Sequence, residues 1–145
     1  MSDPKYTFPS DEWVIAYKDA INASEVYAEV GKEWTHGPMG FIVKAEPSIG
    51  LEEDKAFIVD LDKGACLDAC MATNEKAKDC PFCITGSYAN WKSVLDKKLD
   101  PIKGMMQGKL KLKGNLPIVV RFVKAAQELV NCTTKVNTHF YSEEE

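Results

Sequence analysis

A strict alternation of lysine and leucine late in the chain, at residues 109–113, is the feature that most constrains the fold. Successive side chains of a strand point to opposite faces, so the leucines must face a core while the lysines face water. A helix that Ser87 can cap precedes this strand. A second helix, capped by Asn115 and tolerant of Pro117 in its first turn, follows it and runs to about Val130. A strand placed between two helices must join a sheet that earlier strands have formed.

The earlier part of the chain changes from helical spacing to strand spacing near Met39. Before this point, apolar residues recur every three or four positions in two segments, which predicts two consecutive helices. After it, apolar and polar residues alternate in four runs separated by turn residues, which is typical of antiparallel strands. We predict a meander in which the third and fourth strands form a hairpin across a polar loop, residues 73–79. The four runs cover residues 39–46, 57–62, 65–72 and 80–85.

The length of 145 residues is sufficient for one hydrophobic core and too short for a cofactor domain joined to a substrate domain. Hydrophobic residues make up 45% and charged residues 28%, which excludes a disordered or collagen-like chain. The chain has no apolar stretch of about 18 residues, and its first residues lack the pattern of a signal peptide, so we expect a cytoplasmic protein. We predict an N-terminal arm at residues 1–9, a domain at residues 10–130 and a partly ordered C-terminal extension at residues 131–145.

The second half of the chain carries a recognisable order of motifs. Residues 84–101 end in Leu-Asp-Pro, and residues 106–115 contain Gly-Lys-Leu-Lys and end in Gly-Asn. A strand, a helix over it, a Leu-Asp-Pro turn, a Gly-Lys-Leu-Lys strand and Gly-Asn before the last helix together resemble the sterol carrier protein 2 family. The resemblance covers about Ser10 to Val130 and is strongest between Phe82 and Leu116.

This resemblance implies an α+β fold in which helices cover one face of a five-stranded mixed, mainly antiparallel sheet. It also implies an apolar tunnel between sheet and helices, where the family holds sterols, fatty acids or other long acyl chains. The expected function is non-enzymatic binding and transfer of a hydrophobic small molecule of the sterol, fatty acid or fatty acyl-CoA class. The residues do not distinguish among these classes, and a quinone precursor also fits them.

The candidate walls of such a cavity are apolar residues of the late helices and the late strand. Burial of a ligand chain contributes about 0.8 kcal/mol per CH₂ group, and methionine side chains adapt to several chain shapes. Any helix packed on a sheet needs a similar stripe, so an ordinary core explains these residues too. The last helix, however, is apolar over more than one face, which favours a cavity. The candidates are Trp91, Leu95, Met105, Met106, Leu110, Leu112, Leu116, Val119, Val120, Phe122 and Val123.

Four cysteines support a competing hypothesis, a metal-binding or redox accessory protein. Cys66 and Cys70 lie on one predicted strand and Cys80 and Cys83 on the next, which is the ligand number of a zinc or iron–sulfur site. A hairpin would bring Cys66 near Cys83 and Cys70 near Cys80. Against this, strand periodicity places Cys80 and Cys83 on opposite faces unless Pro81 introduces a bulge. The alternative is that the thiols are buried and have no such role, and the family resemblance does not require them.

Charge is divided unevenly along the chain, and this bears on partners. Residues 1–60 hold five basic and twelve acidic residues, whereas residues 87–124 hold nine basic and two acidic ones. Only Arg121 in the basic segment is an arginine, and alternating lysines are typical of a solvated strand face, so we expect no nucleic-acid partner. Transient contact with an anionic membrane surface through Lys109, Lys111 and Lys113 is a further prediction. Exposed apolar residues on the last helix would suit a homodimer.

Residues with catalytic potential are sparse. His36 and His139 are far apart in the sequence, and the chain contains no Ser/His/Asp arrangement, phosphate-binding loop or dinucleotide-binding motif. Asp60 and Asp62 share one face of a predicted strand, where solvation explains them better than acid–base catalysis. We therefore predict no catalytic residues, no required cofactor and no enzymatic activity.

Overall fold

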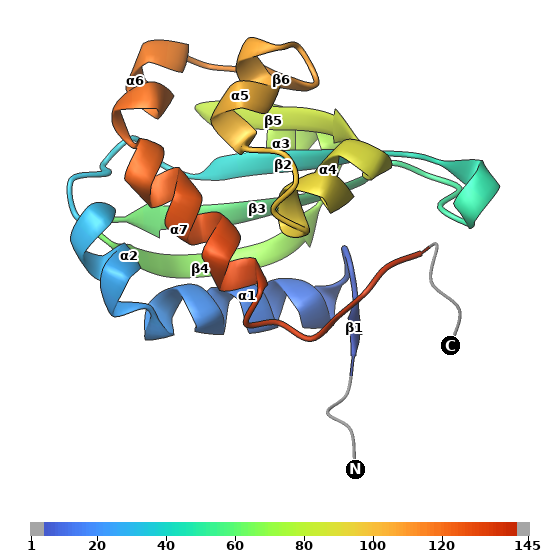
Figure 1. Ribbon diagram of the computed structural model, residues 1–145, viewed down its shortest axis with the longest axis horizontal. Helices are drawn as coiled ribbons and strands as arrows, with labels where there is room; N and C mark the ends of the chain where they lie inside the picture. Colours follow the sequence, from blue (N-terminus) through green and yellow to red (C-terminus); the bar gives the residue numbers. More distant parts are fainter. Residues whose placement is uncertain (1–4, 142–145) are drawn as a thin grey trace.

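The computed structural model describes residues 5–141, and five strands of this part form one mixed sheet in the order β4-β3-β2-β5-β6 (Figure 1). All neighbouring pairs are antiparallel except β2 and β5, which run parallel. The predicted five-stranded, mainly antiparallel α+β fold is confirmed. The strands are β2 (Met39–Lys44), β3 (Lys55–Asp62), β4 (Ala65–Ala72), β5 (Phe82–Ser87) and β6 (Leu110–Lys113).

The predicted meander is wrong at its fourth strand. β5 does not form a hairpin with β4; it lies parallel to β2, with Met39 opposite Phe82 and Lys44 opposite Ser87. The segment predicted as a polar loop contains a helix, α3 (Asn74–Asp79), which carries the chain back from the sheet edge to the middle. The Thr73 hydroxyl caps this helix by accepting a hydrogen bond from the backbone N–H of Lys76 at 3.2 Å.

Helix α3 packs on the face of the sheet opposite to the other helices. Its Ala77 is fully buried, in an apolar cluster with Ile42, Ala56 and Cys83. A Cβ atom at Gly40 would lie 2.3 Å from the carbonyl oxygen of Ala77, so only glycine allows this close approach. The helices therefore cover mainly one face, as expected, while α3 covers the centre of the other.

Most helices on the main face begin at capping side chains that the sequence displays; α7 is the exception. The predicted caps Ser87 and Asn115 are confirmed, because their side chains accept from the N–H groups of Asn90 and Ile118. The helices of this layer are α1 (Asp11–Ala23), α2 (Glu25–Val30), α4 (Tyr88–Leu95), α5 (Pro101–Met106), α6 (Leu116–Arg121) and α7 (Val123–Thr133), and a short 3₁₀ turn, η1 (Pro47–Ile49), follows β2.

The late strand β6 confirms the alternation seen in the sequence. Leu110 is 1% exposed, Leu112 is half-buried, and Lys111 and Lys113 are exposed. β6 is an edge strand that pairs only with β5. Its solvent-facing lysines disfavour further strand pairing at this edge.

The single helix predicted from Asn115 to Val130 is divided at Phe122. This residue has φ −103° and ψ 34°, outside the helical region, and its N–H donates to the Val119 carbonyl at 3.0 Å. α7 then starts at Val123 without a side-chain cap and continues past Val130 to Thr133. The apolar pattern alone does not reveal the break, because helical spacing continues across it.

The two ends of the described chain lie together beside α1 (Figure 1). β1 (Tyr6–Thr7) and β7 (Thr138–His139) form a small parallel sheet. Phe8 and Phe140, outside the predicted 10–130 boundaries, are buried in the core. The Tyr88 hydroxyl joins both ends, since it donates to the Phe8 carbonyl at 3.2 Å and accepts from the Tyr141 N–H at 2.9 Å.

None of the helices within residues 5–141 combines the length and apolar character needed to cross a bilayer. Residues 142–145 of the predicted extension and residues 1–4 of the predicted arm lie outside the described part.

Candidate functional site

An apolar cavity of about 90 Å³ lies between the main face of the sheet and its helical layer. Its inner wall is buried and rich in aromatic rings, which come from the first two helices, from the strands and from the segments that flank these helices. This wall comprises Phe8, Trp13, Tyr17, Tyr27, Trp34, Met39, Phe57, Leu61 and Ile84. Edge-to-face contacts, such as that of Trp13 with Phe57 at a centroid distance of 5.8 Å, keep these rings in place.

The outer wall of the cavity is less buried and comes from the late helices. Half-buried side chains there include Leu95 of α4, Met105 of α5 and Leu129 of α7. Phe122, at the break between α6 and α7, also lines the cavity and packs against Trp34 with ring centroids 5.0 Å apart. The cavity is therefore enclosed by a rigid sheet on one side and by short helices on the other.

Polar atoms of the lining are mostly paired within the protein. The Tyr17 hydroxyl donates to the Leu129 carbonyl at 2.9 Å, the Trp91 indole N–H to the Ile42 carbonyl at 2.9 Å, and the Thr133 hydroxyl to the Val130 carbonyl at 2.6 Å. Among the described residues, no Asp, Glu, Lys, Arg or His lines the cavity. The interior therefore favours apolar groups, and burial of a charged group there would be energetically costly.

The two tyrosines of the lining remain neutral at physiological pH. Burial raises the pKa of Tyr17 well above its ordinary value, and the nearby Cys132 thiol raises it further. Burial likewise raises the pKa of Tyr27, with smaller contributions from Cys66 and Cys132. Neither phenol can supply a negative charge to the cavity.

Five of the predicted wall residues line this cavity, and six lie elsewhere. Leu110 is buried but packs against Gly86 and Gly104, and Met106 and Val120 are 69% and 42% exposed. Leu112, Leu116 and Val123 are half-buried outside the lining. The five that line it are Trp91, Leu95, Met105, Val119 and Phe122.

The aromatic inner wall of the cavity was not predicted from the sequence. Trp13 and Tyr17 share the apolar face of α1, and Tyr27 lies on α2, so each had the spacing of a core residue. The available signal was the concentration of aromatic residues in the first 60 positions. Which of them border a cavity is decided by contacts with residues 119–133, more than 60 positions away.

A shallow groove of about 310 Å³ adjoins the cavity on the surface. It lies between the loop that connects α4 to α5 and the C-terminal half of α7. Pro101 and Val130 line both the groove and the cavity, so these two side chains separate one from the other. The groove is lined by Lys97, Leu99, Asp100, Pro101, Gln127, Val130 and Asn131.

The four cysteines of the predicted metal site are not brought together. β4, which carries Cys66 and Cys70, is separated from β5 by β3 and β2, so the expected proximity across a hairpin is wrong. Cys66 faces the main core, Cys70 is exposed, and Cys83 lies under α3 on the opposite face. Within residues 5–141, no group of three or more His, Cys, Asp or Glu side chains is placed to hold a metal ion.

The histidines are also far apart. His36 packs against Trp34, with ring centroids 4.9 Å apart, and against Phe122 at 5.9 Å. His139 lies in β7, beside the chain ends. The structure thus presents an enclosed apolar cavity as its main candidate site.

These features define a class: an α+β fold whose mixed sheet and helical layer enclose an apolar cavity. Residues 25–127 match the model of the SCP-2 sterol transfer family. The chain belongs to this family, which confirms the resemblance drawn from the late motifs and assigns the chain to a group of lipid-binding and lipid-transfer domains.

Solved structures agree with this assignment. The chain is 32% identical to a crystal structure of sterol carrier protein 2, with a TM-score of 0.80 and coverage of 88% of this chain and 97% of that one. It is 31% identical to a conserved hypothetical protein from Thermus thermophilus, with a TM-score of 0.82 and coverage of 95% and 94%. Sterol carrier protein 2 from Yarrowia lipolytica, 20% identical with a TM-score of 0.57 and coverage of 83% and 88%, shares the fold. A comparison with curated proteins gave no significant match.

Proposed function

We propose that this protein binds a hydrophobic small molecule, of the sterol, fatty acid or fatty acyl-CoA class, and transfers it without chemical reaction. The observation that carries the proposal is the apolar cavity, whose described lining contains no charged side chain. Membership of the SCP-2 sterol transfer family supports it. Burial of a ligand chain in this cavity supplies the affinity, and reversible opening supplies the transfer.

The size of the cavity implies that its walls move when a ligand binds. About 90 Å³ is well below the ~300–1,000 Å³ of typical small-molecule pockets. It is also smaller than the ~150 Å³ cavity that accommodates benzene in an engineered protein. A lipid chain therefore fits only after part of the wall has shifted outwards.

The late helices form the part of the wall best able to shift. The strands are held by continuous hydrogen-bonded ladders on the inner side, whereas Leu95, Met105 and Leu129 of the outer wall are only half-buried. The uncapped break at Phe122 lets α6 and α7 turn relative to one another. Twelve buried CH₂ groups contribute about 10 kcal/mol at ~0.8 kcal/mol each, which offsets the cost of parting these helices.

Native mass spectrometry of the purified protein, before and after denaturation, tests the proposal. We expect the native ion to carry one bound lipid, released on denaturation and identified by its mass. Protein stripped of lipid should then bind a fluorescent fatty acid saturably, at one site per chain. Absence of both a retained lipid and saturable binding would overturn the proposal.

A further inference from the structure

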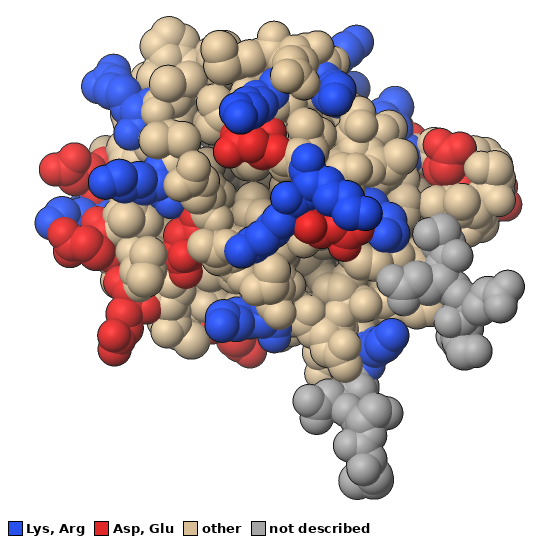
Figure 2. Space-filling model, viewed as in Figure 1, with Lys and Arg blue, Asp and Glu red and all other residues tan. Residues whose placement is uncertain are grey.

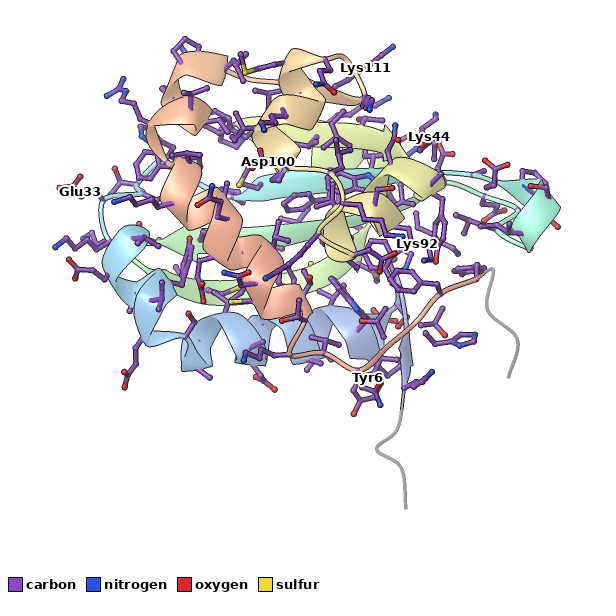
Figure 3. All side chains as sticks on the ribbon, viewed as in Figure 1. Tyr6, Glu33, Lys44, Lys92, Asp100 and Lys111 are labelled. Atoms are coloured by element: carbon purple, nitrogen blue, oxygen red, sulfur yellow. The ribbon has the colours of Figure 1, made fainter. Side chains whose placement is uncertain are left out.

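We propose that the groove between the α4–α5 loop and α7 is the portal of the cavity and that it holds the polar end of the bound ligand. The ligand class is then a single-chain amphiphile whose head is an anionic oxygen group, such as a carboxylate. This inference rests on the proposed function, because it specifies how the cavity is filled. Figure 3 shows Asp100 at the end of this loop, just before α5, and Lys92 on α4, both on the side of α7 away from α2.

The continuity of groove and cavity supports a portal at this place. Pro101, the first residue of α5, and Val130 of α7 line both spaces. Both are apolar and half-buried, so no hydrogen bond or ion pair between them has to break for the two helices to separate. A movement of α5 away from α7 therefore joins the two spaces into one channel.

The polarity of the two spaces determines the orientation of the ligand. Burial of an ionised carboxylate without a partner is very costly, and the described lining of the cavity offers no cationic side chain. The groove is open to water and carries Lys97, Gln127 and Asn131. The chain therefore enters the cavity first, and the charged end stays in the groove.

Lys97 is the residue that distinguishes an anionic head from a neutral one. Its side chain is exposed, and in the described part of the chain it makes no salt bridge. The other charged residue of the groove, Asp100, is engaged as the cap of α5, since its Oδ1 accepts from the N–H groups of Ile102 and Lys103 at 2.8 and 3.1 Å. The cationic side chain is thus available to a ligand, whereas one carboxylate oxygen of Asp100 is occupied.

The portal is tested by exchange kinetics in a matched pair of variants. Val130→Trp enlarges a side chain at the partition, and Val120→Trp enlarges an exposed valine of α6 that lines neither space. Stopped-flow uptake and release of cis-parinaric acid should slow about tenfold in V130W, because a larger side chain must move aside, with the two rates falling together. V120W should exchange at the wild-type rate. Wild-type exchange rates in V130W would overturn the portal.

The orientation is tested with hexadecanoate and hexadecanol as competing ligands. Lys97→Glu should lower the affinity for hexadecanoate about three- to tenfold, which is the size of effect expected of an exposed ion pair. The affinity for hexadecanol should not change. Lys98→Glu, one residue away and outside the groove, is the control. Equal affinities for hexadecanoate in K97E, K98E and the wild type would overturn the orientation.

These outcomes separate this inference from the proposed function. If wild-type protein retains no lipid on purification and binds neither hexadecanoate nor hexadecanol, the proposed function fails and the inference fails with it. If both ligands bind but V130W and K97E behave like their controls, only the portal and the head-group site are disproved.

Discussion

Ala126 illustrates how single residues set the capacity of the cavity. It lines the outer wall on α7 and is half-buried. We predict that Ala126→Phe lowers the affinity for a fatty acid at least tenfold, because the added ring fills space that several CH₂ groups would occupy, each worth about 0.8 kcal/mol. Equilibrium titration with a fluorescent fatty acid measures this.

Val120→Phe is the matched control for this change, since it introduces the same ring at an exposed position of the neighbouring helix. Its affinity should equal that of the wild type. Equal losses in the two variants would mean that the cavity next to α7 is not where the ligand chain lies.

The reactivity of each cysteine thiol depends on its own exposure and pKa. Cys70 is exposed, whereas the other four cysteines are buried. Burial raises the pKa of Cys66 and of Cys132 to about 11, and the carboxylate of Glu128 adds to the effect at Cys132. We predict that one thiol reacts rapidly with a disulfide reagent at pH 8 and that the rest react only after unfolding.

Cys70→Ser should abolish the rapid phase of this reaction, which a stopped-flow absorbance measurement would show directly. Two or more rapid thiols in the native protein would contradict the buried positions of the others.

At the scale of elements, Asp54 links the β2–β3 connection to α3. Its carboxylate accepts from the Ala45 N–H at 2.7 Å, from the Lys44 ammonium at 2.9 Å and from the Asn74 amide at 3.2 Å. The Ala45 N–H, followed by the Lys44 ammonium, holds the pKa of Asp54 below its usual value. These contacts fasten the helix that brings β5 back to the centre of the sheet.

The lowered pKa has a consequence for acid stability. The contribution of Asp54 is complete above the unfolded-state pKa of about 3.9 and is lost as the pH falls through the lower, folded-state pKa. We predict that Asp54→Asn lowers the melting temperature at pH 7 and flattens its decline below pH 4. Melting curves between pH 2 and 7 test this, with Asp79→Asn, an exposed carboxylate at the end of α3, as the control. A parallel decline in D54N and wild type would refute it.

Individual elements were predictable to different degrees. The helices after Ser87 and Asn115 start where capping residues and apolar spacing coincide, and β6 follows from its strict alternation. α3 was missed because its six residues have little apolar periodicity, and only Ala77 is buried. A helix stabilised by one buried alanine and a threonine cap depends on the sheet beneath it.

At the scale of the whole molecule, charge is separated between regions. In Figure 2, basic side chains are spread over the area of α4 to α7, whereas a cluster of acidic side chains lies at the margin beside α2. Lys109, Lys111 and Lys113 are exposed on and beside the edge strand β6, next to the 69% exposed Met106 of the preceding helix. We expect this surface to attract an anionic bilayer.

We predict that reversing Lys109, Lys111 and Lys113 to glutamate abolishes binding to vesicles that contain phosphatidylserine. The physical reason is that each lysine near an anionic surface contributes about 1 kcal/mol to the binding free energy. Vesicle co-sedimentation at low salt measures this. Reversal of Lys63, Lys76 and Lys135, which are exposed on other elements, is the control. Equal retention of vesicle binding by the two triple variants would remove β6 as the docking surface.

Homodimerisation, suggested by the apolar last helix, remains a prediction that sedimentation velocity can test.

Local sequence patterns specified most of the helices and strands, where most of these begin, and the family to which the chain belongs. These properties depend on local spacing, capping side chains and a motif order within about 30 residues. Contacts between distant elements decided the rest. They set the parallel pairing of β5 with β2, the break at Phe122 and the aromatic lining of the cavity. The physical reason is that local periodicity specifies which face of an element is apolar, but not which distant element covers that face or how closely the two pack.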